Sequence, residues 1–172
     1  SMAIATTTVA TYVCEDDGEE ENDIGGPEGV IRVFEELQKV FVGKLERIEL
    51  SDGTTSVGKF RRRWWSRGER GKYGGGCRYE ITKGDIFNRA SVNLSHVDYT
   101  SREKYPIDSA TAFSVILHPQ NPHAPSMHFH VSYMEPRGKA PYWRMIADLN
   151  PAIVNDDDTQ TFELAMRGSR NM

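Results

Sequence analysis

The chain has 172 residues, of which 38% are hydrophobic and 27% are charged, and its formal net charge is -4. This length and apolar content suffice for one domain with a sizeable core. The small negative charge gives no global argument for a nucleic-acid partner. No apolar run reaches the length of a membrane span, so we expect no transmembrane helix.

The two cysteines, Cys14 and Cys77, are far apart, and the first lies in a polar stretch. This argues against a disulfide scaffold and indicates a reducing compartment. We expect a cytoplasmic protein. A mitochondrial location stays open, because a transit peptide is removed after import.

Residues 1–26 are polar and acidic, and we expect a disordered tail there. Residues 27–172 then form a single domain. Pro27 follows two glycines and suits the first turn of a helix. Beyond it, apolar residues recur every three or four positions, which predicts an amphipathic helix to about Glu49 that packs on a sheet. The apolar stripe consists of Val30, Ile31, Phe34, Leu37, Phe41, Leu45 and Ile48.

Short β-prone segments separated by turn residues follow this helix and predict strands. We expect turns at Asp52-Gly53, at Lys83-Gly84-Asp85 and at Arg137-Gly138-Lys139. The fold class is therefore α+β, a mainly antiparallel sheet covered by the N-terminal amphipathic helix. The expected strands are Ser56 to Trp65, Cys77 to Thr82, Ile86 to Leu94, Phe113 to Leu117, Met127 to Met134 and Tyr142 to Leu149.

The basic segment from Lys59 to Lys72 interleaves arginines with two tryptophans, Trp64 and Trp65. Such a segment suits a single-stranded nucleic acid, whose bases stack and whose phosphates pair with cations. It suits equally a flat ring that carries several carboxylates. It is also typical of a solvated strand with tryptophans in the core. Because nothing else in the composition favours nucleic acid, we expect no such partner.

Four of the five histidines lie within thirteen residues, between two apolar runs. The first run predicts a buried strand, and the proline-rich stretch from Pro119 to Pro125 can only form a stiff loop. In the next strand His128 and His130 lie two residues apart and therefore share one polar face. The loop brings the end of the first strand, with Ser114 and His118, near that face.

Three chemistries could use clustered imidazoles of this kind. They could bind a metal ion, act as proton donors and acceptors near neutral pH, or bind an anion when protonated. Asp and Cys ligands with metal-binding spacing are absent nearby, so we expect no metal site. A solvated polar sheet face without a ligand is the fourth interpretation.

The histidine stretch from His118 to Phe129 reads His-Pro-Gln-Asn-Pro-His-Ala-Pro-Ser-Met-His-Phe. Together with three further blocks in order, over about residues 60 to 152, it resembles the oxygen-dependent coproporphyrinogen III oxidases. These haem-pathway enzymes oxidatively decarboxylate two propionates of a porphyrinogen to vinyl groups. The further blocks are Tyr73 to Cys77, Asp85 to His96, and Tyr142-Trp143 with Ala147 to Pro151.

The resemblance implies a role for each residue that matches a family motif. His128 matches the proton donor, and Asp148 matches an aspartate that interacts with pyrrole nitrogens. The implied substrate is a porphyrinogen, with molecular oxygen as co-substrate and with no metal or organic cofactor. The implied substrate-binding residues are Ser114, His118, His130, Val131 and Ser132.

The chain departs from the family pattern in two places. His130, Val131 and Ser132 stand where the family has Asn, an apolar residue and Arg, so an arginine suited to gripping a propionate is missing there. The segment Arg144-Met145-Ile146 stands where the family has three glycines. These departures keep a second hypothesis open, a non-catalytic, truncated relative that binds a tetrapyrrole or a protein partner.

The matching blocks resemble the first half of the family, so its later strands have no counterpart here. A sheet without them should expose an edge of unpaired backbone groups, which natural proteins rarely leave uncovered. We therefore expect either a two-fold homodimer or docking of a second polypeptide.

Overall fold

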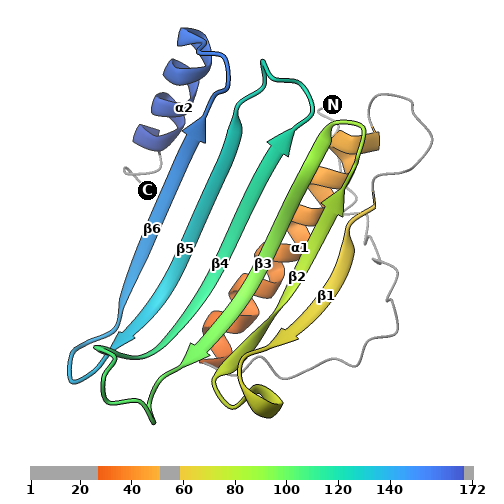
Figure 1. Cartoon of the computed structure of the whole chain (residues 1–172). Helices are drawn as coiled ribbons and strands as arrows, with labels where there is room; N and C mark the ends of the chain where they lie inside the picture. Colours follow the sequence, from red (N-terminus) through yellow and green to blue (C-terminus); the bar gives the residue numbers. More distant parts are fainter. Residues whose placement is uncertain (1–26, 51–58, 169–172) are drawn as a thin grey trace, which may run out of the picture.

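The structure, a computed structural model, describes residues 27–50 and 59–168 (Figure 1). The tail predicted over residues 1–26 and the turn predicted at Asp52-Gly53 lie outside the described residues, as does the start of the strand predicted from Ser56. The fold is α+β, as predicted, with a six-stranded antiparallel sheet, an N-terminal helix and a C-terminal helix.

The strands follow one another across the sheet in chain order, β1 to β6, so that β1 and β6 are its edges. Each strand pairs antiparallel with its sequence neighbour, and a short 3-10 helix, Glu69–Gly71, lies between β1 and β2. The predicted turns around Gly84 and Gly138 are confirmed, and Gly138 has a φ of 69° that favours glycine. The strands are Arg61–Ser66 (β1), Gly74–Thr82 (β2), Phe87–Asp98 (β3), Ile107–Pro119 (β4), Ser126–Pro136 (β5) and Tyr142–Asn150 (β6).

Helix α1, Glu28–Leu50, covers one face of the sheet, and Figure 1 shows it behind β2 to β4. Its predicted extent is confirmed to within one residue. The helix packs on the apolar side chains that point from the middle strands toward it, and each buried Leu, Val or Phe contributes roughly 1.5–3 kcal/mol. Core side chains with the least exposure are Phe34, Val42, Val92, Leu94, Phe113 and Val115.

The last turn of α1 departs from the predicted stripe, because Ile48 is 46% exposed whereas Glu49 is buried. The Glu49 carboxylate accepts hydrogen bonds from the backbone N–H groups of Ile86 and Phe87, both at 3.0 Å. A hydrogen bond to a charged group stabilises by about 1.5–3 kcal/mol, so two of them exceed the gain from burying Ile48. Glu49 thereby fastens the end of α1 to the turn between β2 and β3.

Helix α2, Asp156–Gly168, was not among the predicted elements. Asn155 caps it, because its side-chain oxygen accepts the N–H of Asp157 at 3.0 Å. Three aspartates in the first turn stabilise the helix further, because their negative charges lie at the positive, N-terminal end of the helix dipole. None of its described residues is buried, so packing contributes little to this helix. No helix in the described ranges is long and apolar enough to cross a membrane.

Candidate functional site

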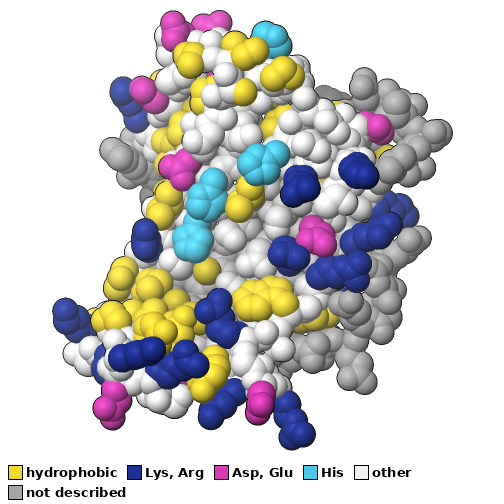
Figure 2. Space-filling view, viewed as in Figure 1, with side chains coloured by type: hydrophobic (Ala, Val, Ile, Leu, Met, Phe, Trp, Pro, Cys, Tyr) yellow, Lys and Arg dark blue, Asp and Glu magenta, His cyan; other side chains and the backbone are white. Residues whose placement is uncertain are grey.

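No helix or strand among the described residues covers the sheet face opposite α1, which we call the open face, and the strands present polar side chains there. Residues paired across antiparallel strands point to the same face, so the strand register shows which side chains meet. Figure 2 views this open face, with histidines gathered over β4 and β5 and with lysines and arginines over β1 to β3. Three rows cross β4, β5 and β6: Ile116, His128 and Asp148; Ser114, His130 and Ile146; Ala112, Ser132 and Arg144.

His128 and Asp148 form a pair in the first of these rows. The Nδ1 atom of His128 lies 3.3 Å from Oδ2 of Asp148, and the two side chains are 37% and 51% exposed. A carboxylate there accepts the Nδ1–H of the imidazole and leaves Nε2 to exchange a proton with a ligand. We call these two residues the His–Asp pair.

His130 lies beside the His–Asp pair, with its ring centroid 6.3 Å from that of His128. The two histidines therefore share a face, as the sequence predicts. Partial burial lowers the pKa of His130 below its ordinary value, and the positive charges of His128 and Arg144 lower it further. His130 is consequently neutral near pH 7 and can offer a polar contact without a charge.

Of the remaining predicted site residues, Ser114, His118 and Ser132 lie on the open face, whereas Val131 lies on the core side. Ser114 pairs with His130, and His118 lies further along β4, where its Nδ1 is 3.1 Å from Oγ of Ser126. The expected approach of the two strand ends is therefore present. Val131 points the other way and packs against the core under α1, so its side chain lies away from the histidines. Ser132 is on the open face but only 2% exposed, and its hydroxyl has no hydrogen-bond partner among the described residues.

A hollow of about 560 Å³ borders Ser114 on its β3 side. Its aromatic wall is Trp65, whose indole Nε1 donates to Oδ1 of Asn93 at 3.1 Å. Neighbouring strand residues point to opposite faces, so Trp64 packs against the core while Trp65 lies on the open face. Period-two alternation in the Arg-Trp-Trp run could have located this residue, although the sequence interpretation did not separate the two tryptophans. The other main lining residues are Arg63, Arg78, Glu80, Ser91 and Ile116.

Gly76 makes room for the Trp65 ring. The two residues are paired across β1 and β2, and a Cβ added at Gly76 would lie 2.7 Å from Cζ2 of Trp65 and would also meet the backbone of Leu94. The glycine-rich block is thus a strand segment beneath an indole. This position explains why a side chain there would not fit.

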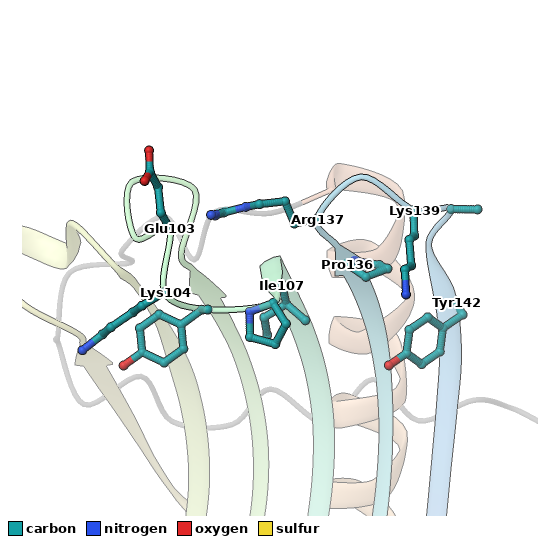
Figure 3. A pocket seen from close by; sticks show the side chains of 10 residues that line it. Glu103, Lys104, Ile107, Pro136, Arg137, Lys139 and Tyr142 are labelled. Carbon is teal, nitrogen blue, oxygen red and sulfur yellow. The ribbon is translucent and has the colours of Figure 1, made fainter.

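A second hollow, of about 600 Å³, lies at the other end of the open face (Figure 3). Lys104, Lys139 and Tyr142 point to one side in this view, whereas Glu103 points away from them. Arg137, in the loop after β5, donates through Nε to Asp108 of β4 at 2.7 Å and through Nη2 to the Tyr99 carbonyl in the loop before β4 at 3.1 Å. We call this the Tyr142 hollow. It is slightly larger than the hollow beside Trp65, but its lining contains no histidine.

Comparison with known proteins gives one consistent result. Residues 29–170 match the family model described as coproporphyrinogen III oxidase. The mitochondrial oxygen-dependent coproporphyrinogen-III oxidase of Rattus norvegicus is 31% identical over 123 residues, which cover 59% of this chain and 28% of the rat protein. The corresponding oxidase of Rickettsia akari is 27% identical over 147 residues, covering 78% of this chain and 50% of the bacterial protein.

A third relative, the oxygen-dependent coproporphyrinogen-III oxidase of Drosophila melanogaster, is 28% identical over 123 residues. These residues cover 60% of this chain and 32% of the fly protein. The chain thus spans half or less of the length of these relatives. The family-model match over residues 29–170 includes the whole sheet, α2 and all of α1 except its first residue.

Proposed function

Because this chain belongs to the coproporphyrinogen III oxidase family, we propose that its open sheet face binds a porphyrinogen and decarboxylates its propionates with molecular oxygen. The observation that carries this proposal is the His–Asp pair, which lies beside Ser114 and His130 on one exposed face. The proposal includes no metal and no organic cofactor.

The reaction at one propionate balances with O₂ as the oxidant. The side chain loses its carboxylate as CO₂ and one hydrogen from the carbon next to the ring, and a vinyl group forms. Two electrons pass to O₂, which combines with that hydrogen and one proton to give H₂O₂. A proton must therefore be supplied or relayed close to the substrate.

The His–Asp pair can donate or accept that proton. Nε2 of His128 faces away from the carboxylate and can donate to or accept from the substrate, while Asp148 stabilises the imidazolium that forms in between. Asp148 is half exposed, so its second oxygen can also accept pyrrole N–H groups. Ser114, His118 and His130 offer polar contacts, and Val131 anchors the segment from the core side.

The decisive test is turnover of coproporphyrinogen that has been prepared anaerobically and then exposed to air. The proposal predicts vinyl product and CO₂ from the wild-type chain and neither from the His128→Ala variant. His123→Ala is the matched control, because His123 lies on the loop between β4 and β5. Equal product in wild type and His128→Ala would defeat the proposed role of His128.

A second candidate function is tetrapyrrole binding without turnover. Exposure of the His–Asp pair favours it, because solvent on both side chains weakens the electrostatic effects that catalysis needs. Fluorescence titration with coproporphyrin III, run beside the turnover assay, separates the two functions. Binding without product supports the second candidate, and product formation excludes it.

The proposal also includes self-association and a reducing compartment, either cytoplasmic or mitochondrial. Edge strand β6 supports a two-fold homodimer, since it carries Trp143 and Met145, which are 55% and 50% exposed. The relatives named above include a mitochondrial and a bacterial protein, which supports either compartment.

A further inference from the structure

Arg144 occupies a position on the open face that the proposed function does not yet use. In β6 the side chains on this face alternate as Tyr142, Arg144, Ile146 and Asp148. Arg144 therefore stands between the Tyr142 hollow and the His–Asp pair. At about 3.4 Å per residue, it lies roughly 14 Å along the strand from Asp148, a separation that a tetrapyrrole with propionates on different rings can cover.

The cross-strand neighbours of Arg144 are small. The register places Ser132 directly opposite Arg144, and Ala112 opposite Ser132 on the far side. Neither of these side chains rises far above the sheet. The guanidinium consequently has space to reach over β5 toward His130, or to meet a ligand that lies on this row.

Polar groups in this row lack partners. The Arg144 guanidinium donates to no acceptor among the described residues, and the buried Ser132 hydroxyl has no hydrogen-bond partner there either. Two other arginines of this face and its rim are ion-paired, Arg78 with Glu80 at 2.8 Å and Arg137 with Asp108 at 2.7 Å. Arg144 is therefore a cation available to a ligand.

The charge of Arg144 acts on His130. After burial and the charge of His128, it is the third cause of the lowered pKa of His130. His130 thus stays neutral beside the guanidinium, and the positive charge that an anionic group would meet in this row is carried by Arg144. A guanidinium matches the two oxygens of a carboxylate with two parallel N–H donors.

We propose that Arg144 binds a propionate carboxylate of the porphyrinogen, with Ser132 and His130 as polar neighbours, and so positions the macrocycle against the His–Asp pair. This rests on the proposed function, because the anion is a propionate of the same substrate. Arg144 is a substrate-positioning residue. It does not exchange protons.

The test uses two probes that differ only in their carboxylates, coproporphyrin III and its tetramethyl ester. The wild-type chain should bind the tetracarboxylate, and Arg144→Gln should weaken that binding about tenfold to a hundredfold, the value of a charge-assisted hydrogen-bond pair. Arg144→Lys should weaken it less. Affinity for the ester should be the same in wild type and Arg144→Gln, because the ester has no carboxylate to bind.

The strand register permits a sharper variant. In Ser132→Arg/Arg144→Ser the guanidinium moves to the opposite strand of the same cross-strand pair. This double variant should recover most of the affinity that Arg144→Ser loses alone. Arg32→Gln on α1, behind the sheet, is the control for loss of one positive charge and should bind like wild type.

The outcomes separate this inference from the function on which it rests. If the wild-type chain forms vinyl product and Arg144→Gln binds coproporphyrin III equally well, the role of Arg144 is wrong and the proposed function stands. If Arg144→Gln weakens both probes alike, the loss is structural and the carboxylate contact is wrong. If the wild-type chain binds neither probe, both proposals fall.

Discussion

At the scale of single residues, the histidine cluster divides into side chains with different partners. His128 contacts a carboxylate, His118 contacts a serine hydroxyl, and His130 is partly buried beside His128, with Arg144 nearby. A carboxylate that accepts the Nδ1–H of an imidazole fixes the tautomer and leaves Nε2 to exchange a proton with a ligand. This is the physical reason for assigning proton transfer to His128 among the described histidines of the face.

Replacing Asp148 by Asn tests that assignment. The amide keeps the shape of the side chain but cannot stabilise a charged His128, so we expect kcat to fall about 100-fold or more, the usual contribution of acid–base catalysis. Oxygen consumption with coproporphyrinogen gives kcat and KM. A raised KM with unchanged kcat would instead indicate that Asp148 serves only to bind pyrrole N–H groups.

His130 should make the stability of the fold depend on pH. Its pKa in the folded chain lies below the ordinary value of about 6.5, so the unfolded chain binds more protons as the pH falls. Stability should therefore rise with pH across the range just below 6.5 and be lost as the solution is acidified. In His130→Asn this contribution disappears.

Thermal denaturation of wild type and His130→Asn between pH 5 and 7.5 measures the effect. As the pH decreases, the Tm of wild type should fall more than the Tm of the variant. A difference in Tm that stays constant over the whole range would contradict the assigned direction of the pKa.

At the scale of strands and helices, alternation and turn residues predicted the middle of the sheet well. The strand from Phe113 to Leu117 was expected from its β-branched run, but β4 starts six residues earlier, at Ile107. The added residues include Ser109, Ala110 and Ala112, whose β-propensity is low. Pairing with β3 on one side and β5 on the other makes them a strand, and a local pattern does not contain that information.

The candidate site was predictable to a similar degree. Period-two spacing put His128 and His130 on one face, whereas the resemblance supplied Asp148 and Ser114. The contact of Asp148 with His128 depends on the register between β5 and β6, which no short motif encodes. Helix α2 could have been predicted from its Asn155 cap. The position of Trp65 on the open face could have been predicted from the period-two alternation in β1.

The glycine block offers a test at this scale. Gly76→Ala places a methyl group against the Trp65 ring and the backbone of Leu94, and overpacking of this kind costs roughly 1–3 kcal/mol. Gly43→Ala in α1 is the matched control, because no heavy atom lies within 4 Å of its added Cβ. It should stabilise by about 0.5–1 kcal/mol.

Urea denaturation of the two alanine variants measures these free energies of unfolding. Gly76→Ala should also change the fluorescence of the chain, since Trp65 must move from its place over β2. If both alanines shift the midpoint in the same direction, the indole does not lie over Gly76.

At the scale of the whole molecule, the sheet has one face covered by α1, one open face and two edges. Edge strand β6 combines unpaired backbone groups with the exposed side chains Trp143 and Met145. Such an edge pairs readily with another strand. A second copy of the chain could pair there by a two-fold axis and extend the sheet across the interface.

Light scattering over a concentration series tests this assembly. We expect a dimer that dissociates on dilution, and we expect Met145→Lys to shift the equilibrium to monomer, because a charge on an edge strand opposes pairing. Val40→Lys in α1, where the side chain is 50% exposed behind the sheet, serves as the control. A mass that stays monomeric at every concentration would show that β6 does not pair with a second copy.

The reaction proposed for this chain is the removal of propionate carboxylates from a porphyrinogen with O₂. The most direct measurement is release of labelled CO₂ from coproporphyrinogen that carries the label in its propionate carboxyl groups. We expect labelled CO₂ from the wild-type chain only when O₂ is present, and none from His128→Ala. The proposal would be contradicted if the chain bound the porphyrinogen, remained folded and released no label in air.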